Sequence, residues 1–316
     1  MKSRSWKIFW TLVIGLPLAA FAAWGLWDNT RLFAVTFLNG ITLASLYFIV
    51  AAGFTLVFGL MRNVNLAHGS LYLLGGYLGF LVAHHTGWFV LALAAGFAGA
   101  ALVGLAMQVS VFRFMPGEDL RQTLVTIALS IIIADLLLWW LGGTVHQADA
   151  PELLSGPLRD IPLIKAYSKY RLALLPIGIA IGVALWLFLN RTRVGMMIRA
   201  GVDDRAMLSA AGVNVNVLFA VTFAIGAGLA GLGGVIGAVE LSMAPGEDVR
   251  LLLASLIVVI IGGMGSVVGA ALGASILGLA ETYGLAYAPT YSVVFTFVIL
   301  ALVLAFRPRG FLGRPA

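Results

Sequence analysis

Residues 32–60 read LFAVTFLNGITLASLYFIVAAGFTLVFGL and contain no charged side chain. A helix needs about 20 apolar residues to cross the hydrocarbon core of a bilayer, so this run is long enough to span one. A second charge-free run covers residues 217–239. Both runs are continuously apolar, whereas a transmembrane β-barrel would show apolar and polar residues alternating along short strands. The sequence therefore predicts membrane-spanning α-helices.

The composition of the whole chain is that of a protein whose main solvent is lipid. Of its 316 residues, 61% are hydrophobic and 10% are charged, while an ordinary soluble domain has about 25% charged residues. The chain has room for about ten spans, so we expect an all-α polytopic membrane protein with a single domain over residues 1–316. The expected spans are 8–27, 32–60, 66–83, 88–112, 123–142, 172–190, 217–240, 251–264, 267–287 and 292–306. With no cysteine, the chain has neither a disulfide framework nor a thiolate metal site.

The net charge of +6 is distributed unevenly between the two sides of this predicted topology. Thirteen of the 19 Lys and Arg residues fall on the side that carries both termini. Because Lys and Arg in short loops are retained in the cytoplasm, both termini are predicted to be cytoplasmic. The positive charge is thus a topology signal, and no nucleic-acid partner is expected. The N-terminal run also imitates a signal peptide. Because Trp24 and Trp27 continue the run past the small-residue site, at positions typical of an interfacial aromatic belt, an uncleaved first span is expected, and a processed N-terminus is the alternative.

A short internal repeat suggests that the chain has two related halves. The hexapeptide LFAVTF occurs at residues 32–37 and again at residues 218–223, and the two copies open the second and seventh expected spans. A five-span unit repeated once inverts its topology, as in many transporters. Coincidence is the alternative in a sequence this apolar. If the repeat is real, the halves cover residues 1–142 and 172–306.

A cluster of glycines predicts a break in the helices near the C-terminus. Gly262, Gly263 and Gly265 occupy three of four consecutive positions, and each glycine destabilises a helix by about 1 kcal/mol. Interrupted backbone at membrane depth is tolerated only where it is buried in protein or lines a wet cavity. The segment is therefore a candidate for the wall of a solute pathway.

Four sequence blocks stand out along nearly the whole chain. They are GFTLVFG (53–59) with VNLAHG (64–69), GMMIRA (195–200) continuing to GVN (212–214), the glycine-rich residues 262–273, and RPRG (307–310). In this order the blocks resemble the permease subunits of branched-chain amino acid type ABC importers, and the chain is more similar to the shorter of the two permeases in such importers.

This resemblance implies several partners in an inner-membrane importer. It implies a second homologous permease, two cytoplasmic ATP-binding subunits and a periplasmic solute-binding protein, besides the membrane lipid. It also implies that the cytoplasmic connection over residues 191–216 couples the permease to the ATPases. A helix is expected over residues 203–211. The coupling candidates are Arg199, Asp203, Asp204, Arg205 and Gly212.

The sequence also indicates, independently of the resemblance, that this chain does not itself hydrolyse ATP. A phosphate-binding Walker loop needs Gly-Lys followed by Ser or Thr, and none of the four lysines follows a glycine. Any ATP must therefore be hydrolysed by another chain. No motif for a membrane enzyme, a metal or a cofactor is present, since the common hydrolase and zinc motifs are missing and His84 and His85 point about 100° apart on a helix.

Polar residues within the expected spans are candidates for the translocation pathway, because they are costly in lipid unless partnered or functional. Thr126 and Ser130 lie one turn apart, and either contact a solute or bond the backbone of their own helix. Asn65 and His68 either brace a bend or touch the solute. Glu281 is expected near the external end of its span, where it reaches water. The pathway candidates are Asn39, Asn65, His68, Tyr72, Thr126, Ser130 and Asp135.

Asp135 is where the chain departs from the family pattern, which tends to have Gln-Asn where Ala134 and Asp135 stand. A carboxylate beside the path disfavours an anionic group and favours an amine or another donor. This departure argues against a leucine-like solute. The resemblance implies a small solute of the branched-chain amino acid type, either an amino acid or a related small polar or amphipathic compound. The alternative function is an ion- or proton-coupled secondary transporter or channel that uses Asp135 or Glu281 as a relay. The external loop over residues 143–171 either docks the binding protein or is simply solvated.

Overall fold

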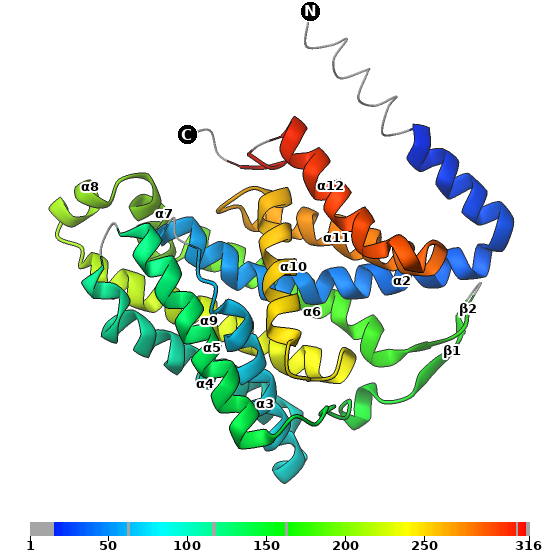
Figure 1. Cartoon of the computed structure of the whole chain (residues 1–316), viewed down its shortest axis with the longest axis horizontal. Helices are drawn as coiled ribbons and strands as arrows, with labels where there is room; N and C mark the ends of the chain where they lie inside the picture. Colours follow the sequence, from blue (N-terminus) through cyan, green and yellow to red (C-terminus); the bar gives the residue numbers. More distant parts are fainter. Residues whose placement is uncertain (1–15, 62–63, 116–117, 162–163, 308, 314–316) are drawn as a thin grey trace, which may run out of the picture.

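The computed structural model describes residues 16–61, 64–115, 118–161, 164–307 and 309–313 (Figure 1). Long helices dominate this part of the chain. They are α2 (Leu16–Met61), α3 (His68–Thr86), α4 (Phe89–Ser110), α5 (Asp119–Leu141), α6 (Lys169–Arg191), α7 (Arg193–Asp203), α8 (Arg205–Ala210), α9 (Val215–Glu240), α10 (Glu247–Gly262), α11 (Val267–Tyr287) and α12 (Ser292–Phe306). The short elements are the 3₁₀ helices η2 (Phe112–Phe114), η3 (Glu152–Leu154) and η4 (Pro289–Tyr291), and the strands β1 (Pro157–Ile161) and β2 (Ile164–Ser168).

The helices confirm a polytopic helical membrane protein, although the count of ten spans is only approximate. From the third expected span onward, each coincides with one helix to within a few residues. The second is continuous with an earlier helix in α2, which bends at Asn29 (φ −152°, ψ 85°), where the side-chain oxygen accepts a hydrogen bond from Leu32 N at 2.9 Å. Seven helical segments among the described residues are long and apolar enough to cross a membrane, and α3 and α10 are not among them. Residues 8–15 of the first expected span, and the question of N-terminal processing, lie outside the described residues, while its residues 16–27 belong to α2.

Helix α9 is at the centre of the bundle and contacts α2, α3 and α4. Glycines permit this packing: a Cβ added at Gly75 of α3 would lie 2.1 Å from the Cα of Gly231 of α9. One added at Gly53 of α2 would lie 2.3 Å from the carbonyl oxygen of Gly226. In lipid, where no hydrophobic force drives helices together, such close backbone contact is a main source of association.

The contacts of the two helix sets α2–α5 and α9–α12 correspond to one another. Helices α2 and α9 pack against each other, α4 packs on α9, and α11 packs on α2. Likewise α3 contacts α4 and α5, as α10 contacts α11 and α12. The hexapeptide copies lie at equivalent places, within α2 and near the start of α9. The internal repeat itself stays a prediction.

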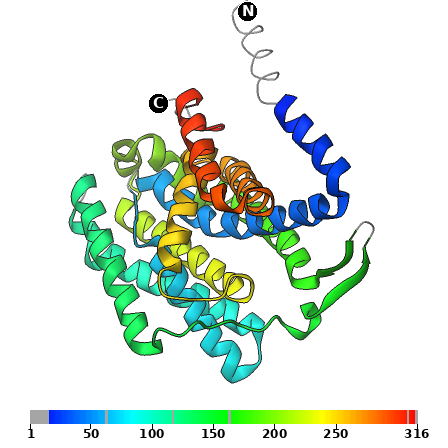
Figure 2. The same ribbon diagram turned by 45° about the vertical axis from the view of Figure 1, so that its right-hand side comes forward.

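Two connections differ from their expected structure. The loop over residues 143–171 contains an antiparallel hairpin in which β1 pairs with β2, although nothing in the apolar patterning indicated strands. The connection after α6 contains two helices instead of one, because Asp204 ends α7 and starts α8, so the helix expected from residue 203 begins at Arg205. The hairpin and the α7–α8 pair lie at opposite ends of the bundle in both views (Figures 1 and 2).

Candidate translocation and coupling sites

Thr126 and Ser130 connect α5 to the start of α3. The Thr126 hydroxyl donates to Thr123 O at 2.7 Å and accepts from Leu66 N at 3.1 Å. The hydroxyls of Ser130 and Ser70 lie 2.6 Å apart, and Ser70 also bonds the backbone oxygen of Ser130. These hydroxyls therefore join two helices, so a solute would have to displace them.

Asn65 and His68 stabilise the turn into α3. The side-chain oxygen of Asn65 accepts from Ala67 N at 3.1 Å. The fully buried His68 ring places Nε2 2.9 Å from the backbone oxygen of Val50 and packs edge-on against Phe54. Since a carbonyl only accepts, Nε2 carries the proton. This geometry fits the bracing role that the sequence left open.

Tyr72 points into the contact between α3 and α9. Its side chain is 1% exposed, and a Cβ added at Gly237 would lie 2.1 Å from its hydroxyl oxygen. Among the described residues this hydroxyl has no hydrogen-bond partner. The position of Tyr72 is thus one of helix packing.

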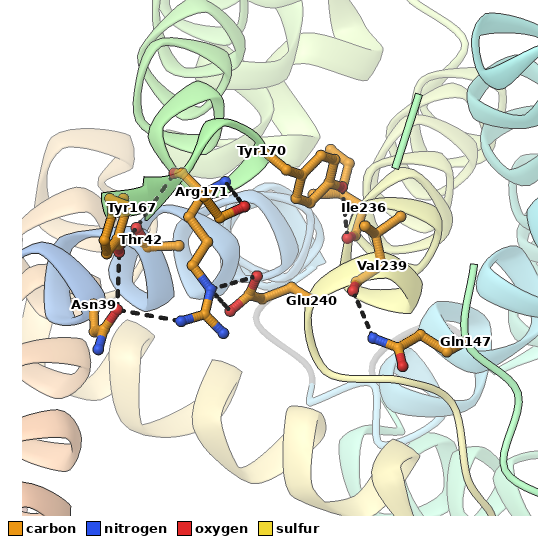
Figure 3. Close-up of polar contacts among 10 residues, drawn as sticks. Asn39, Thr42, Gln147, Tyr167, Tyr170, Arg171, Ile236, Val239 and Glu240 are labelled. Atoms are coloured by element: carbon orange, nitrogen blue, oxygen red, sulfur yellow. Dashed lines mark hydrogen bonds and ion pairs between the residues drawn. The ribbon is translucent and has the colours of Figure 1, made fainter. Parts of the chain in front are cut away.

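Asn39 lies in a polar network that holds the hairpin to α2 and α9 (Figure 3). Its side-chain oxygen accepts from Tyr167 Oη at 2.9 Å and from Arg171 Nη1 at 3.4 Å. Burial raises the pKa of the Tyr167 phenol, so the hydroxyl remains protonated and donates. Arg171 also forms an ion pair with Glu240 at the end of α9, with Nε and Oε1 2.9 Å apart. The basic side chain of Arg171 was expected to face a binding protein or solvent. It instead bonds to Asn39 and Glu240 of this chain.

Glu281 is paired, which corrects the expectation that it merely reaches water. Its Oε1 lies 3.1 Å from Arg250 Nη2, and Tyr47 donates to its Oε2 at 2.6 Å. Arg250 also pairs with Glu247 at 3.4 Å. Helices α2, α10 and α11 are thus joined by one polar cluster.

The break at residues 262–265 is covered by the C-terminal segment. Helix α10 ends at Gly262, and Gly263 and Gly265 have φ values of 101° and 76°. The backbone oxygens of Ile261 and Gly262, which have no helical partner, accept from the N–H groups of Phe311 and Leu312, both at 2.9 Å. Gly262 also lies against α11, where an added Cβ would be 2.1 Å from Gly269 O. The buried backbone of the break is therefore satisfied by protein, one of the two alternatives for such segments.

Asp135 lies on the exposed side of α5 and borders a cavity of about 300 Å³ between α3, α5 and α10. Ser130 from the same helix, Tyr77 from α3 and Asp248 from α10 also line this cavity. Asp248 was not among the residues expected in the pathway, because residues 241–250 read as a polar connection between two spans. The sequence did contain a signal for this site, because Asp248 is an acidic residue in the first turn of a membrane helix and follows Gly246.

The coupling candidates surround two capped helices, α7 and α8. Thr192 caps α7 by accepting from Gly195 N at 3.0 Å, and Asp204 caps α8 by accepting from Met207 N at 2.9 Å. Arg199 donates to Asn190 at 2.8 Å and thereby ties α7 to α6. Asp203 ends α7, Arg205 begins α8, and Gly212 follows α8 with a φ of 84°.

The outer surface of these two helices carries large apolar side chains. Met207 is 71% exposed and Met196 is 48% exposed, and neither was singled out from the sequence. Flexible methionines are well suited to adaptable binding surfaces.

The bundle, the exposed carboxylate in a membrane helix and the projecting capped helices define a polytopic transport permease. The chain matches the family described as branched-chain amino acid transport system, permease component, over residues 36–304. It belongs to this family.

Several branched-chain amino acid permeases that are similar in sequence agree with this membership. The chain is 31% identical to the high-affinity branched-chain amino acid transport system permease protein BraD of Pseudomonas aeruginosa, over 88% of this chain and 94% of BraD. It is 31% identical to the corresponding protein LivH of Escherichia coli K12, with the same coverage. A probable LivH of Methanocaldococcus jannaschii is 24% identical over 87% of this chain and 91% of that protein. Among solved structures, PsaBC from Streptococcus pneumoniae in complex with Fab aligns with a TM-score of 0.47 at 15% identity, covering 92% of this chain and 97% of that one.

Proposed function

We propose that this chain is the transmembrane permease subunit of an ATP-driven ABC importer in a bacterial inner membrane. Its solute is of the branched-chain amino acid type, meaning an amino acid or a related small polar or amphipathic compound. The observation that carries the proposal is the match of nearly the whole chain to permease components of branched-chain amino acid transport systems. The sequence has no Walker loop, so the ATP is hydrolysed by two separate cytoplasmic subunits.

The exposed face of α5 supports a partner permease. Most of the α5 span is exposed, and this face includes the Asp135 side chain. A charged side chain facing lipid at membrane depth is unfavourable, so in the assembly this face meets water or protein. A second, homologous permease against α5 would place Asp135 beside a shared pathway, into which the binding protein delivers the solute. Of the sequence candidates, Asp135 then lines this pathway, while Asn39, Asn65, His68, Tyr72, Thr126 and Ser130 hold the helices around it.

The α7–α8 pair supplies the surface for coupling to the ATPases. Met196 and Met207 provide apolar contact, and the caps at Thr192 and Asp204 keep the two helices in place. Both termini and α7–α8 are cytoplasmic in this proposal, and the hairpin faces the binding protein. The corresponding contacts of α2–α5 and α9–α12 fit an inverted repeat, in which one half rocks against the other during alternating access.

The test is a photo-crosslinking experiment on the complex purified with its neighbouring gene products. A photoreactive amino acid at Met207 should crosslink to an ATP-hydrolysing subunit, because this side chain projects from α8. A matched probe at Leu153, which is 86% exposed at the opposite end, should not. Purified complex in proteoliposomes should show solute uptake that requires ATP.

Two results would contradict the proposal. One is a purified complex without any ATPase. The other is uptake driven by an ion gradient alone, which would establish the alternative of a secondary transporter. Glu281 already has Arg250 and Tyr47 as partners, which leaves Asp135 as the relay in that case.

A further inference from the structure

The cavity between α3, α5 and α10 has two carboxylates in its wall, from elements far apart in the sequence. Asp135 is contributed by α5 and Asp248 by the first turn of α10. The volume of about 300 Å³ lies at the lower end of the range for small-molecule sites. The cavity is therefore large enough for part of a small solute.

Asp248 is buried but unpartnered. Its side chain is 6% exposed, and among the described residues its carboxylate has neither a hydrogen-bond nor an ion-pair partner. Arg250, two residues further along α10, pairs instead with Glu247 and Glu281. The carboxylate oxygens of Asp248 are not fully enclosed by protein, so the carboxylate opens onto the cavity that Asp248 lines and can meet a cation there.

The rest of the cavity wall has no compensating positive charge. Its lining side chains, taken from the described residues, include no Lys, Arg or His. Leu73, Ile131, Leu137 and Val249 make much of the wall apolar, and Ser130 and Tyr77 also line it. The wall thus combines uncompensated negative charge with an aliphatic surface.

We propose that this cavity binds the positively charged ammonium group of the transported solute, with Asp135 and Asp248 as its counter-charges. The inference deepens the proposed function, on which it rests, by naming the chemistry of the bound group. The ammonium group supplies the charge and the hydrogen-bond donors that Asp248 lacks. The aliphatic part of the solute packs on the apolar wall. A solute whose only charge is a carboxylate is repelled.

The natural absence of cysteine makes the cavity directly testable. The probe variant is Ile131→Cys, because Ile131 lines the cavity and is 56% exposed. The purified complex is treated with two small methanethiosulfonate reagents, one carrying an ammonium group and the other a sulfonate, and the mass shift of this chain gives both rate constants. The variant Leu153→Cys provides the reference ratio for an open aqueous site.

The expected result is a strong preference for the ammonium reagent in Ile131→Cys relative to Leu153→Cys. Adding Asp135→Asn or Asp248→Asn to the probe variant should lower this preference about tenfold, the combined effect on a cationic and an anionic reagent of removing one unit charge about 6 Å away at the dielectric constant of water, about 80. Asp135→Glu, which keeps the charge, should preserve it. Asp119→Asn is the matched control, because Asp119 is exposed on α5 and lies about 18 Å along the helix from residue 131.

Two outcomes would overturn the proposal. One concerns the ratio of the ammonium rate constant to the sulfonate rate constant at position 131: the proposal fails if this ratio equals the ratio at position 153, or if it stays unchanged in both Asn variants. The other is no reaction at position 131 while the thiol at position 153 reacts, which would show that aqueous solutes do not reach the cavity. The measurement needs neither ATP nor a known solute, so its failure is distinguishable from a failure of the import function.

Discussion

Replacing Asp204 with alanine should lower both transport and transport-stimulated ATP hydrolysis by loosening α8. Asp204 accepts the hydrogen bond of Met207 N at 2.9 Å and is the N-cap of this six-residue helix. Loss of an N-cap costs about 1 kcal/mol, and a helix this short is far below the roughly 12–15 residues at which isolated helices become marginally stable. A change of about 1 kcal/mol shifts the balance between formed and frayed α8 roughly fivefold.

The assay combines hydrogen exchange with activity in the reconstituted complex. The amides of Leu208 and Ala211 bond to Asp204 O and Met207 O at 3.2 and 3.0 Å, so both should exchange roughly fivefold faster in Asp204→Ala. ATP-dependent uptake and transport-stimulated ATP hydrolysis should decrease together, while the amount of protein in the membrane stays the same.

Asp204→Asn is the matched variant, because asparagine caps a helix about as well as aspartate. It should retain both the exchange protection and the activity. If Asp204→Asn loses as much activity as Asp204→Ala, the charge of Asp204 matters and not its cap. If Asp204→Ala leaves exchange at Leu208 unchanged, the cap does not stabilise α8 and the reasoning is refuted.

Three further changes test the packing and the polar contacts of the bundle. Gly75→Ala places a Cβ 2.1 Å from the Cα of Gly231 and should lower the free energy of unfolding by about 1–3 kcal/mol; thermal unfolding in detergent measures this, and Gly143→Ala, whose Cβ meets only Leu138 at 3.8 Å, should be close to neutral. Glu281→Gln should reduce stability less than Glu281→Leu, which also leaves the Tyr47 hydroxyl unpaired at a cost of about 1–3 kcal/mol; equal melting temperatures of the two variants would contradict the role of this contact. Gly263 has a φ of 101°, and the Cβ of Gly263→Ala would lie 2.2 Å from Gly313 N, so this variant should detach the C-terminal segment and speed tryptic cleavage at Arg309. Gly142 also has a positive φ, but the Cβ of Gly142→Ala would meet no atom within 4 Å, so this control should leave the cleavage rate at Arg309 unchanged.

The positions of the membrane helices follow from local sequence alone. The expected span at 88–112 became α4 (Phe89–Ser110), and the span at 267–287 became α11 with the same bounds. This agreement has a simple cause, since an apolar segment in lipid must satisfy its own backbone hydrogen bonds and therefore forms a helix. The interruption after Gly262 was predictable for the same reason, because closely spaced glycines weaken the helix locally.

The partners of the polar side chains were decided only by the tertiary structure. Asn39 bonds Tyr167 and Arg171 from the hairpin and α6, and Glu281 bonds Tyr47 and Arg250 from two other helices. Asp135 and Asp248 border one cavity although they belong to different halves of the chain. Hydropathy specifies which segments enter the membrane, but which faces of the helices meet depends on close backbone contacts such as Gly75 with Gly231. Those contacts join residues distant in sequence, so no local pattern contains them.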